Sequence, residues 1–172
     1  MADLATDKFD MAMGGITRNA ERAKVALLSA GYLADGKTQL VRAADKDKYR
    51  TIGDIDKPDV RVVTNPGGTN EKFDRANFKV AQIVVVEKNL LVPQALADGK
   101  ADVFITDGVE AILIAKTNPG LVAVDPTHPF THDEKGYLLH QDDAALLTAL
   151  NAWEAKAQAD GTYARLRAKW IG

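Results

Sequence analysis

Short apolar runs alternate with longer segments of mixed polarity along most of the chain. Runs rich in β-branched residues are typical of strands, whereas apolar residues that recur every three or four positions are typical of helices. This alternation predicts an α/β fold with mostly parallel strands. The predicted strands are Phe9–Met13, Gln39–Arg42, Val60–Thr64, Gln82–Val86, Val103–Thr106, Leu121–Val124 and Gly136–Leu139. The predicted helices are Ala20–Leu28, Asn70–Phe78, Leu91–Asp98, Gly108–Lys116, Asp143–Asp160 and Tyr163–Lys169.

Two details of this pattern predict which residues are buried. The run Ile83-Val84-Val85-Val86 is apolar without alternation, so its strand is expected to be covered on both faces. The predicted helix 143–160 carries an apolar stripe that includes Leu150 and Trp153. We interpret this stripe, and Trp170 as well, as part of the core.

Composition narrows the class of protein. The 172 residues are 46% hydrophobic and 27% charged, which is typical of a globular chain that folds as one large domain or two small lobes. The net charge is −2 and the basic residues are scattered, which argues against nucleic acid or an anionic membrane surface as a partner. No apolar run approaches the roughly 18 residues of a membrane span. The absence of cysteine excludes disulfides, thiolate nucleophiles and cysteine-based metal sites.

A glycine-rich turn joins the predicted strand 60–64 to the predicted helix 70–78. Its sequence is Asn65-Pro66-Gly67-Gly68-Thr69-Asn70-Glu71. A helix start presents free backbone N–H groups, and glycines permit positive φ and close approach of a ligand. The hydroxyl of Thr69 would lie where the helix dipole favours negative charge. No Gly-Lys-Ser/Thr follows, so the turn is not a P-loop, and we expect a small anion such as a carboxylate. The alternative is an ordinary capped helix start.

A second glycine pair precedes a predicted helix within Gly14–Arg22. Thr17 or Asn19 could cap this helix, and Arg22 would fall in its first turn. A cation is unfavourable to the helix dipole there unless it serves a ligand. Because a guanidinium binds a carboxylate through two parallel hydrogen bonds, Arg22 is a candidate anion-binding residue. The alternative is a surface arginine paired with Glu21 or another neighbour.

Two carboxylates follow the predicted strand 103–106. Asp107 would lie at the carboxyl end of a parallel strand, where ligand clefts form in α/β folds. Glu110 is three residues further on, on the same face of the helix start. In a cleft, one carboxylate could bind an ammonium group while the other, desolvated, holds a proton and acts as a general acid. The alternative is a capping box, which has the same Asp-x-x-Glu pattern.

The remaining candidates are one lysine and three histidines. Lys37, within Asp35-Gly36-Lys37-Thr38, could reach a ligand from a chain crossover, although a lysine in a turn is usually solvated. His128, His132 and His140 lie close in sequence, but their spacing does not suit one helix face and no acidic pattern accompanies them. We therefore expect no metal site.

These motifs together resemble those of a known family. Two sets of residues resemble signatures of the amino-acid-type periplasmic solute-binding proteins, which have the type II periplasmic-binding fold: Gly15-Ile16-Thr17 with Glu21-Arg22, and Gly99-Lys100-Ala101-Asp102 with Asp107. Four segments resemble one branch of that fold, the cyclohexadienyl dehydratases, which dehydrate prephenate or arogenate: Asn65–Glu71, Asp107–Glu110, Asp35–Thr38 and Pro129-Phe130. The resemblance extends over nearly all of the chain.

The resemblance implies a role for each matching residue. A substrate carboxylate would be held by Thr17, Arg22 and Thr69, with Gly68 and Asn70 from the same turn as Thr69. Lys37 and Asn65 would line the cleft, and Asp107 would lie where transport relatives bind the α-amino group of their ligand. Glu110 would be the general acid, and no cofactor would be required. The alternative is a non-catalytic amino-acid-binding subunit of an ABC importer, which would use Arg22, Thr69 and Asp107.

The resemblance also predicts two lobes with a central cleft. Residues 1–38 and 138–172 would form lobe one, and residues 39–137 would form lobe two. Because Met1–Lys8 resembles the second half of a helix, we expect that lobe one is incomplete and that further residues precede Met1 in the natural protein. Exposed strand edges of such a lobe could pair with a second copy and give a homo-oligomer.

Partner and location follow from the same resemblance. The expected partner is a small carboxylate or amino acid, with no nucleic acid and no insertion into a membrane. The expected location is the bacterial periplasm, although this chain shows no signal peptide.

Overall fold

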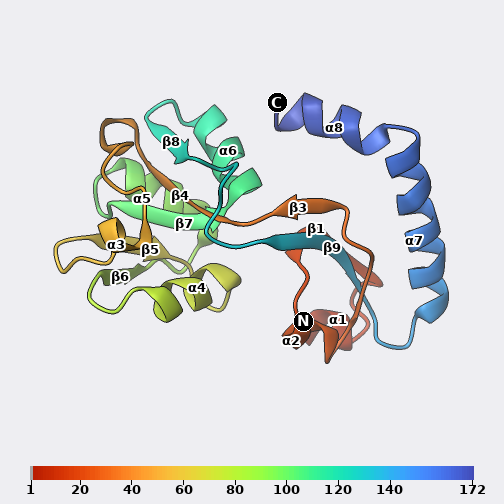
Figure 1. Cartoon of the computed structure of the whole chain (residues 1–172). Helices are drawn as coiled ribbons and strands as arrows, with labels where there is room; N and C mark the ends of the chain where they lie inside the picture. Colours follow the sequence, from red (N-terminus) through yellow and green to blue (C-terminus); the bar gives the residue numbers. More distant parts are fainter. Residues whose placement is uncertain (1) are drawn as a thin grey trace. The chain divides into compact units, whose positions relative to one another are not determined.

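The computed structural model describes residues 2–172, which form two compact units (Figure 1). Unit 1 consists of the residues up to Ala34 together with Asp133–Gly172, and unit 2 consists of Asp35–His132. Each unit has its own sheet and its own hydrophobic core. Unit 2 is thus an insertion within the sequence of unit 1.

Unit 2 is built on a five-stranded sheet. The strand order is β6 (Gln82–Val85), β5 (Arg61–Thr64), β7 (Val103–Asp107), β4 (Lys37–Arg42) and β8 (Leu121–Val124). β5 is parallel to β6 and β7, whereas β4 is antiparallel to both of its neighbours, β7 and β8. β4 therefore runs against the other four strands, and its register places Lys37 opposite Asp107.

Helices cover both faces of this sheet (Figure 1). α5 (Val92–Ala97) and α6 (Gly108–Thr117) pack on one face, around Leu40, Val63 and Phe104. α3 (Ile52–Ile55) and α4 (Thr69–Asn77) pack on the other, around Val41, Val62 and Ile105. Adjacent residues of a strand point to opposite faces, so the consecutive apolar residues of β4, β5 and β7 supply both cores. Short 3-10 turns at Ala43–Asp45 (η1) and Asn89–Leu91 (η2) complete the unit.

Unit 1 contains a four-stranded sheet centred on β9 (Asp133–Leu139). β1 (Met11–Thr17) and β2 (Leu27–Leu28) are antiparallel to β9, and β3 (Leu33–Asp35) also pairs with it. The helices of this unit are α1 (Ala2–Ala5), α2 (Ala20–Ala23), α7 (Ala144–Ala159) and α8 (Thr162–Trp170). Leu138 and Leu139 point into separate apolar clusters, as expected for neighbours in a strand.

The predicted α/β class is confirmed, but the prediction of mostly parallel strands was wrong. In unit 2, β4 enters between β7 and β8 and makes antiparallel pairs with both, and β1 and β2 are antiparallel to β9 in unit 1. The predicted two-sided burial of the run 83–86 was also wrong. β6 is an edge strand, and Val85 is 41% exposed. An apolar run therefore did not distinguish a central strand from an edge strand.

Two further predictions failed in unit 1. Trp153 and Trp170 are 50% and 58% exposed, so neither is a core residue, although Leu150 of the same stripe is buried. The predicted helix 20–28 ends at Ala23, because Leu27 and Leu28 pair with β9 as β2. Tertiary pairing here overrides a local preference for helix.

The boundary between the units lies a few residues from the predicted lobe limits. Lys37 and Thr38 are the first residues of β4 and pair with β7, so they belong to unit 2. Asp133–Leu139 forms β9, the central strand of unit 1. Of the predicted helical segment at the N-terminus, Ala2–Ala5 is helical and Met1 lies outside the described residues. No helix among residues 2–172 has the length and apolar character needed to cross a membrane.

Candidate functional site

A glycine turn delivers the chain from β5 to the start of α4 in unit 2. Gly67 has φ of +80°, a conformation that side chains other than glycine rarely adopt. Gly68 occupies the N-cap position, and no side chain caps this helix. The N-cap residue of α4 therefore supplies no side-chain acceptor for the backbone N–H groups of the first turn. This arrangement favours the predicted anion-binding turn over a turn capped by Thr69 or Asn70.

Glu71 holds the turn in place from within the first turn of α4. Its carboxylate accepts a hydrogen bond from the backbone N–H of Gly67 at 2.7 Å and two from the guanidinium of Arg75 at 2.8 and 2.9 Å. The hydrogen bond from Gly67 and the pairing with Arg75 lower the pKa of Glu71. Glu71 thus remains ionised at neutral pH and stabilises the conformation of the glycine turn.

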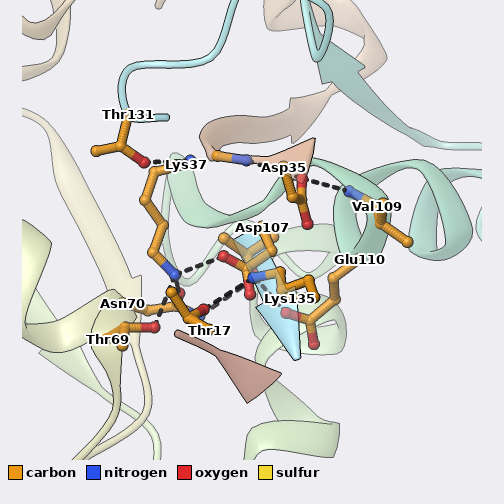
Figure 2. Close-up of polar contacts among 12 residues, drawn as sticks. Thr17, Asp35, Lys37, Thr69, Asn70, Asp107, Val109, Glu110, Thr131 and Lys135 are labelled. Carbon is orange, nitrogen blue, oxygen red and sulfur yellow. Dashed lines mark hydrogen bonds and ion pairs between the residues drawn. The ribbon is translucent and has the colours of Figure 1, made fainter. Parts of the chain in front are cut away.

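Lys37 lies at the centre of the polar cluster of unit 2 (Figure 2). Its Nζ donates to Thr69 Oγ1 at 2.9 Å, to Asn70 Oδ1, and to Asp107 Oδ1 at 2.8 Å. The side chain is only 3% exposed. The expectation that a turn lysine is solvated does not hold for this residue, because Lys37 begins β4 rather than occupying a turn. One buried ammonium therefore joins the start of α4 to the end of β7.

Asp107 occupies the N-cap position of α6, but it does not act as a cap. Its side chain makes no capping hydrogen bond and instead accepts from Lys37. Asp35 takes over this role, since its Oδ1 accepts from the backbone N–H of Val109 at 3.3 Å and of Gly36 at 2.9 Å. The approach is close: a Cβ on Gly108 would lie 2.9 Å from Asp35 Oδ1. The capping-box alternative for Asp107 and Glu110 is therefore wrong.

Glu110 is hydrogen-bonded to the same cluster through Thr106. Thr106 is fully buried, and its hydroxyl donates to Glu110 Oε2 while accepting from Asn70 Nδ2 at 3.2 Å. A weaker contact joins Asn89 Nδ2 to Glu110 Oε1 at 3.5 Å. The amide of Asn70 is thus engaged at both ends, by Lys37 and by Thr106. Asn65 precedes the turn, and its Nδ2 lies 3.9 Å from the position that a Cβ of Gly68 would take.

Unit 1 contains the other predicted ligand residues, Thr17 and Arg22. Thr17 ends β1 and is 5% exposed, and its Oγ1 accepts from Lys135 Nζ at 2.8 Å across the β1–β9 pair. Arg22 donates through Nη1 to the backbone carbonyl of Thr17, and its own N–H donates to the capping side chain of Asn19 at 2.9 Å. Two cationic side chains, Lys135 and Arg22, therefore surround Thr17. An anion-binding role for Arg22 stays a prediction.

Four residues of these clusters were not predicted as functional from the sequence: Asp35, Asp74, Thr106 and Lys135. Asp74 is fully buried in α4, one turn beyond Asn70, and neither carboxyl oxygen has a hydrogen-bond partner within geometric limits among the described residues. Desolvation raises the pKa of Asp74 to about 7, against smaller opposing effects of Thr64 and Lys37. The spacing of Asn70 and Asp74 by four positions was a readable signal, because both would share one helix face.

Each cluster, taken by itself, offers groups that suit an anionic organic molecule. Unit 2 offers a buried ammonium, the start of α4 and a carboxyl group at Glu110, and unit 1 offers Arg22 and Lys135 beside a hydroxyl. Among residues 2–172, no group of three or more histidine, aspartate or glutamate side chains has an arrangement that could hold a metal ion. The charged and hydroxyl groups of these clusters can bind charges and transfer protons.

Comparison with known proteins identifies similar chains. The family described as bacterial extracellular solute-binding proteins, family 3, matches residues 1–172. A cyclohexadienyl dehydratase from Pseudomonas aeruginosa is 42% identical over 171 residues, which is 99% of this chain and 63% of that protein. This chain thus spans somewhat less than two thirds of the length of that relative.

Solved structures agree on the fold. The crystal structure of an ancestral amino-acid-binding protein, described as a precursor of cyclohexadienyl dehydratase, is 33% identical with a TM-score of 0.89 and covers 99% of this chain and 73% of its own. An ancestral cyclohexadienyl dehydratase is 50% identical with a TM-score of 0.56, covering 99% and 70% respectively. These similarities confirm the predicted type II periplasmic-binding fold.

Proposed function

This chain belongs to the bacterial extracellular solute-binding proteins of family 3, and from that premise we propose that the natural protein is a dehydratase. Its reaction would convert prephenate to phenylpyruvate, arogenate to phenylalanine, or both. The similarity to the dehydratase of Pseudomonas aeruginosa and to an ancestral dehydratase supports this proposal. The extracellular character of the family supports a location in the bacterial periplasm.

The ion pair between Lys37 and Asp107 is the observation that carries the proposal. In transport relatives, the carboxylate at this position is expected to bind the α-amino group of the ligand. Here the ammonium of Lys37 already donates to Asp107 Oδ1 at 2.8 Å and is almost completely buried. A ligand ammonium would have to compete with it, so the pair favours prephenate, which has a keto group, over arogenate and over ordinary amino acids. The same lysine supplies a fixed positive charge for a carboxylate or oxo group.

The chemistry requires one proton and no cofactor. In prephenate, loss of the ring carboxylate as CO₂ leaves its bonding electrons in the ring, and the ring expels the hydroxyl group at the opposite carbon. Glu110 would deliver a proton to that oxygen, so that water rather than hydroxide departs and Glu110 becomes a carboxylate. Prephenate dianion and one proton thus give phenylpyruvate monoanion, CO₂ and water. Solvent would then reprotonate Glu110.

The other candidate residues would bind and orient the substrate. Thr69, Gly68 and Asn70 belong to the start of α4, where backbone N–H groups and the helix dipole favour a carboxylate. Thr17 and Arg22 of unit 1 would hold a carboxylate through a hydroxyl and a guanidinium, and Lys37 and Asn65 would line the site. Fixing a dianion in one orientation lowers the entropic part of the barrier.

The alternative function is an amino-acid-binding subunit of an ABC importer. The ancestral amino-acid-binding protein of similar fold supports it. A receptor would need Arg22, Thr69 and Asp107, but it would need no proton donor at Glu110. The two functions therefore differ in what Glu110 does.

The test is dehydration of prephenate and of arogenate by the full-length natural protein, with phenylpyruvate from prephenate followed by its absorbance and phenylalanine from arogenate measured by chromatography. We expect turnover that falls at least 100-fold in Glu110→Gln, since a positioned general acid contributes about 10²- to 10⁴-fold. Binding of a non-reacting dicarboxylate should change little in this variant. Glu87→Gln, which makes the same change at an exposed position, is the matched control. Absence of turnover together with tight binding of an amino acid would instead identify a receptor.

A further inference from the structure

A continuous chain of hydrogen bonds connects Lys37 to Glu110. Lys37 Nζ donates to Asn70 Oδ1, Asn70 Nδ2 donates to Thr106 Oγ1 at 3.2 Å, and Thr106 Oγ1 donates to Glu110 Oε2. The first three of these residues are buried, and Thr106 is fully buried. The chain crosses from β4 to α4 to β7 and ends on α6, so it joins four elements of unit 2.

The direction of each hydrogen bond is forced by the first. An ammonium group can only donate, so the atom of Asn70 that faces Lys37 must be the carbonyl oxygen. The other end of the amide is then the NH₂ group, which can only donate to Thr106. The hydroxyl of Thr106 accepts from Asn70 and consequently directs its own hydrogen toward Glu110.

This direction distinguishes the two oxygens of Glu110. Oε2 accepts from Thr106, so a proton on the neutral carboxyl group belongs on Oε1. The other contact of Glu110, from Asn89 Nδ2 to Oε1, is 3.5 Å long and lies at the limit for a hydrogen bond. Oε1 therefore remains available to give its proton away.

We propose that Thr106 is a positioning residue that fixes the rotamer of Glu110 and keeps its transferable proton on Oε1. Thr106 acts through Glu110 and does not touch the substrate. The inference rests on the proposed function, because it assumes that Glu110 is the general acid. It adds that Asn70 acts through its side chain by holding Thr106 as a donor. Neither role follows from the binding of an anion by the start of α4.

The test compares Thr106→Val, Thr106→Ser and Asn70→Asp in the full-length natural protein. Valine has nearly the shape of threonine but cannot donate, and we expect kcat for prephenate to fall about 10- to 100-fold with KM changed less than threefold. Serine keeps the hydroxyl and should restore kcat to within about threefold. Aspartate at position 70 can still accept from Lys37, but it cannot donate to Thr106 and would draw the hydroxyl away from Glu110. Asn70→Asp should therefore lower kcat as Thr106→Val does.

The outcomes separate this inference from the proposed function. If Thr106→Val and Asn70→Asp both keep kcat while Glu110→Gln loses it, the positioning role is wrong and the general acid stands. If the unmodified protein does not dehydrate either substrate, both proposals fall together. In the double variant, Thr106→Val should lower kcat no further than Glu110→Gln alone does. A purely structural defect would instead lower both kcat and melting temperature, whether or not Glu110 is also replaced. If Thr106→Val does not fold, Asn70→Asp and the serine variant decide the question.

Discussion

Asp74 provides a test of the electrostatics of α4 that needs no knowledge of the ligand. Its carboxyl group is fully exposed to solvent in the unfolded chain and fully buried in the folded one. Burial raises the pKa of Asp74 from 3.8 to about 7. The folded protein therefore holds this proton over a pH range in which the unfolded chain has already released it. Stability consequently falls as pH rises from about 4 to about 7, and the full penalty remains above that range.

The size of the penalty follows from the two pKa values. A difference of roughly three pKa units corresponds to about 4 kcal/mol at about 1.36 kcal/mol per unit. Asn approximates the shape of the protonated carboxyl group and cannot ionise. Asp74→Asn should therefore be about 4 kcal/mol more stable than the unmodified protein at pH 8.5, and the two should differ little at pH 4.

Urea unfolding at pH 4, 5.5, 7 and 8.5 measures this difference, because urea leaves the ionic strength unchanged. Asp98→Asn is the matched control, since Asp98 is more exposed and hydrogen bonds from Gln94 and Lys100 lower its pKa. That variant should show no gain in stability as pH rises. If Asp74→Asn is less stable than the unmodified protein by the same amount at pH 4 and at pH 8.5, burial does not raise the pKa of Asp74. The carboxylate would then be ionised and well paired in the folded protein.

Three further substitutions test the ligand clusters and the core. Arg22→Ala should weaken binding of a carboxylate ligand about 10- to 100-fold in a calorimetric titration, through loss of a charge-assisted pair, and an unchanged Kd would place Arg22 outside the site. Lys37→Met should lower prephenate turnover and strengthen binding of amino acids, because Asp107 loses its internal partner; continued rejection of amino acids would contradict the role given to this pair. Asp102→Asn should cost about 3 kcal/mol at neutral pH, since Asp102 accepts from Arg61 and Arg42. Burial alone would raise the pKa of Asp102, but these hydrogen bonds outweigh it and lower the pKa, so the cost should disappear in urea titrations as the pH falls below about 4.

Sequence patterns predicted the positions of the main ligand candidates because those positions follow local rules. Gly67 and Gly68 mark a turn between a strand and a helix, and Asp107 ends a mostly apolar strand just before a helix. Each of these features is determined by a few neighbouring residues. The family resemblance then supplied the roles, which local patterns could not.

Partners that come from distant parts of the chain were not predictable in this way. Lys37 and Asp107 are 70 positions apart and meet only because β4 is antiparallel to β7 in one register. The side chain that caps α6 is that of Asp35, which is also distant in sequence from this helix. A cap from a distant residue leaves no local pattern such as Asp-x-x-Glu, so it could not be predicted. The short strand β2 was predicted as helix, because only its pairing with β9 makes it extended.

The chain enters and leaves unit 2 through two neighbouring segments, and their proximity affects the order in which the two units fold. The two crossing segments are hydrogen-bonded to each other, since Lys37 N–H donates to Thr131 Oγ1 at 2.9 Å and Phe130 N–H donates to the Lys37 carbonyl at 2.7 Å. In unit 1, by contrast, Thr17 must find Lys135, which is 118 positions away. Closing so long a loop in an unfolded chain is slow and entropically costly. Once unit 2 has folded, its two ends lie side by side, and β1 needs to search only a short distance for β9. Folding of the inserted unit should thus precede and accelerate assembly of the unit that surrounds it in sequence.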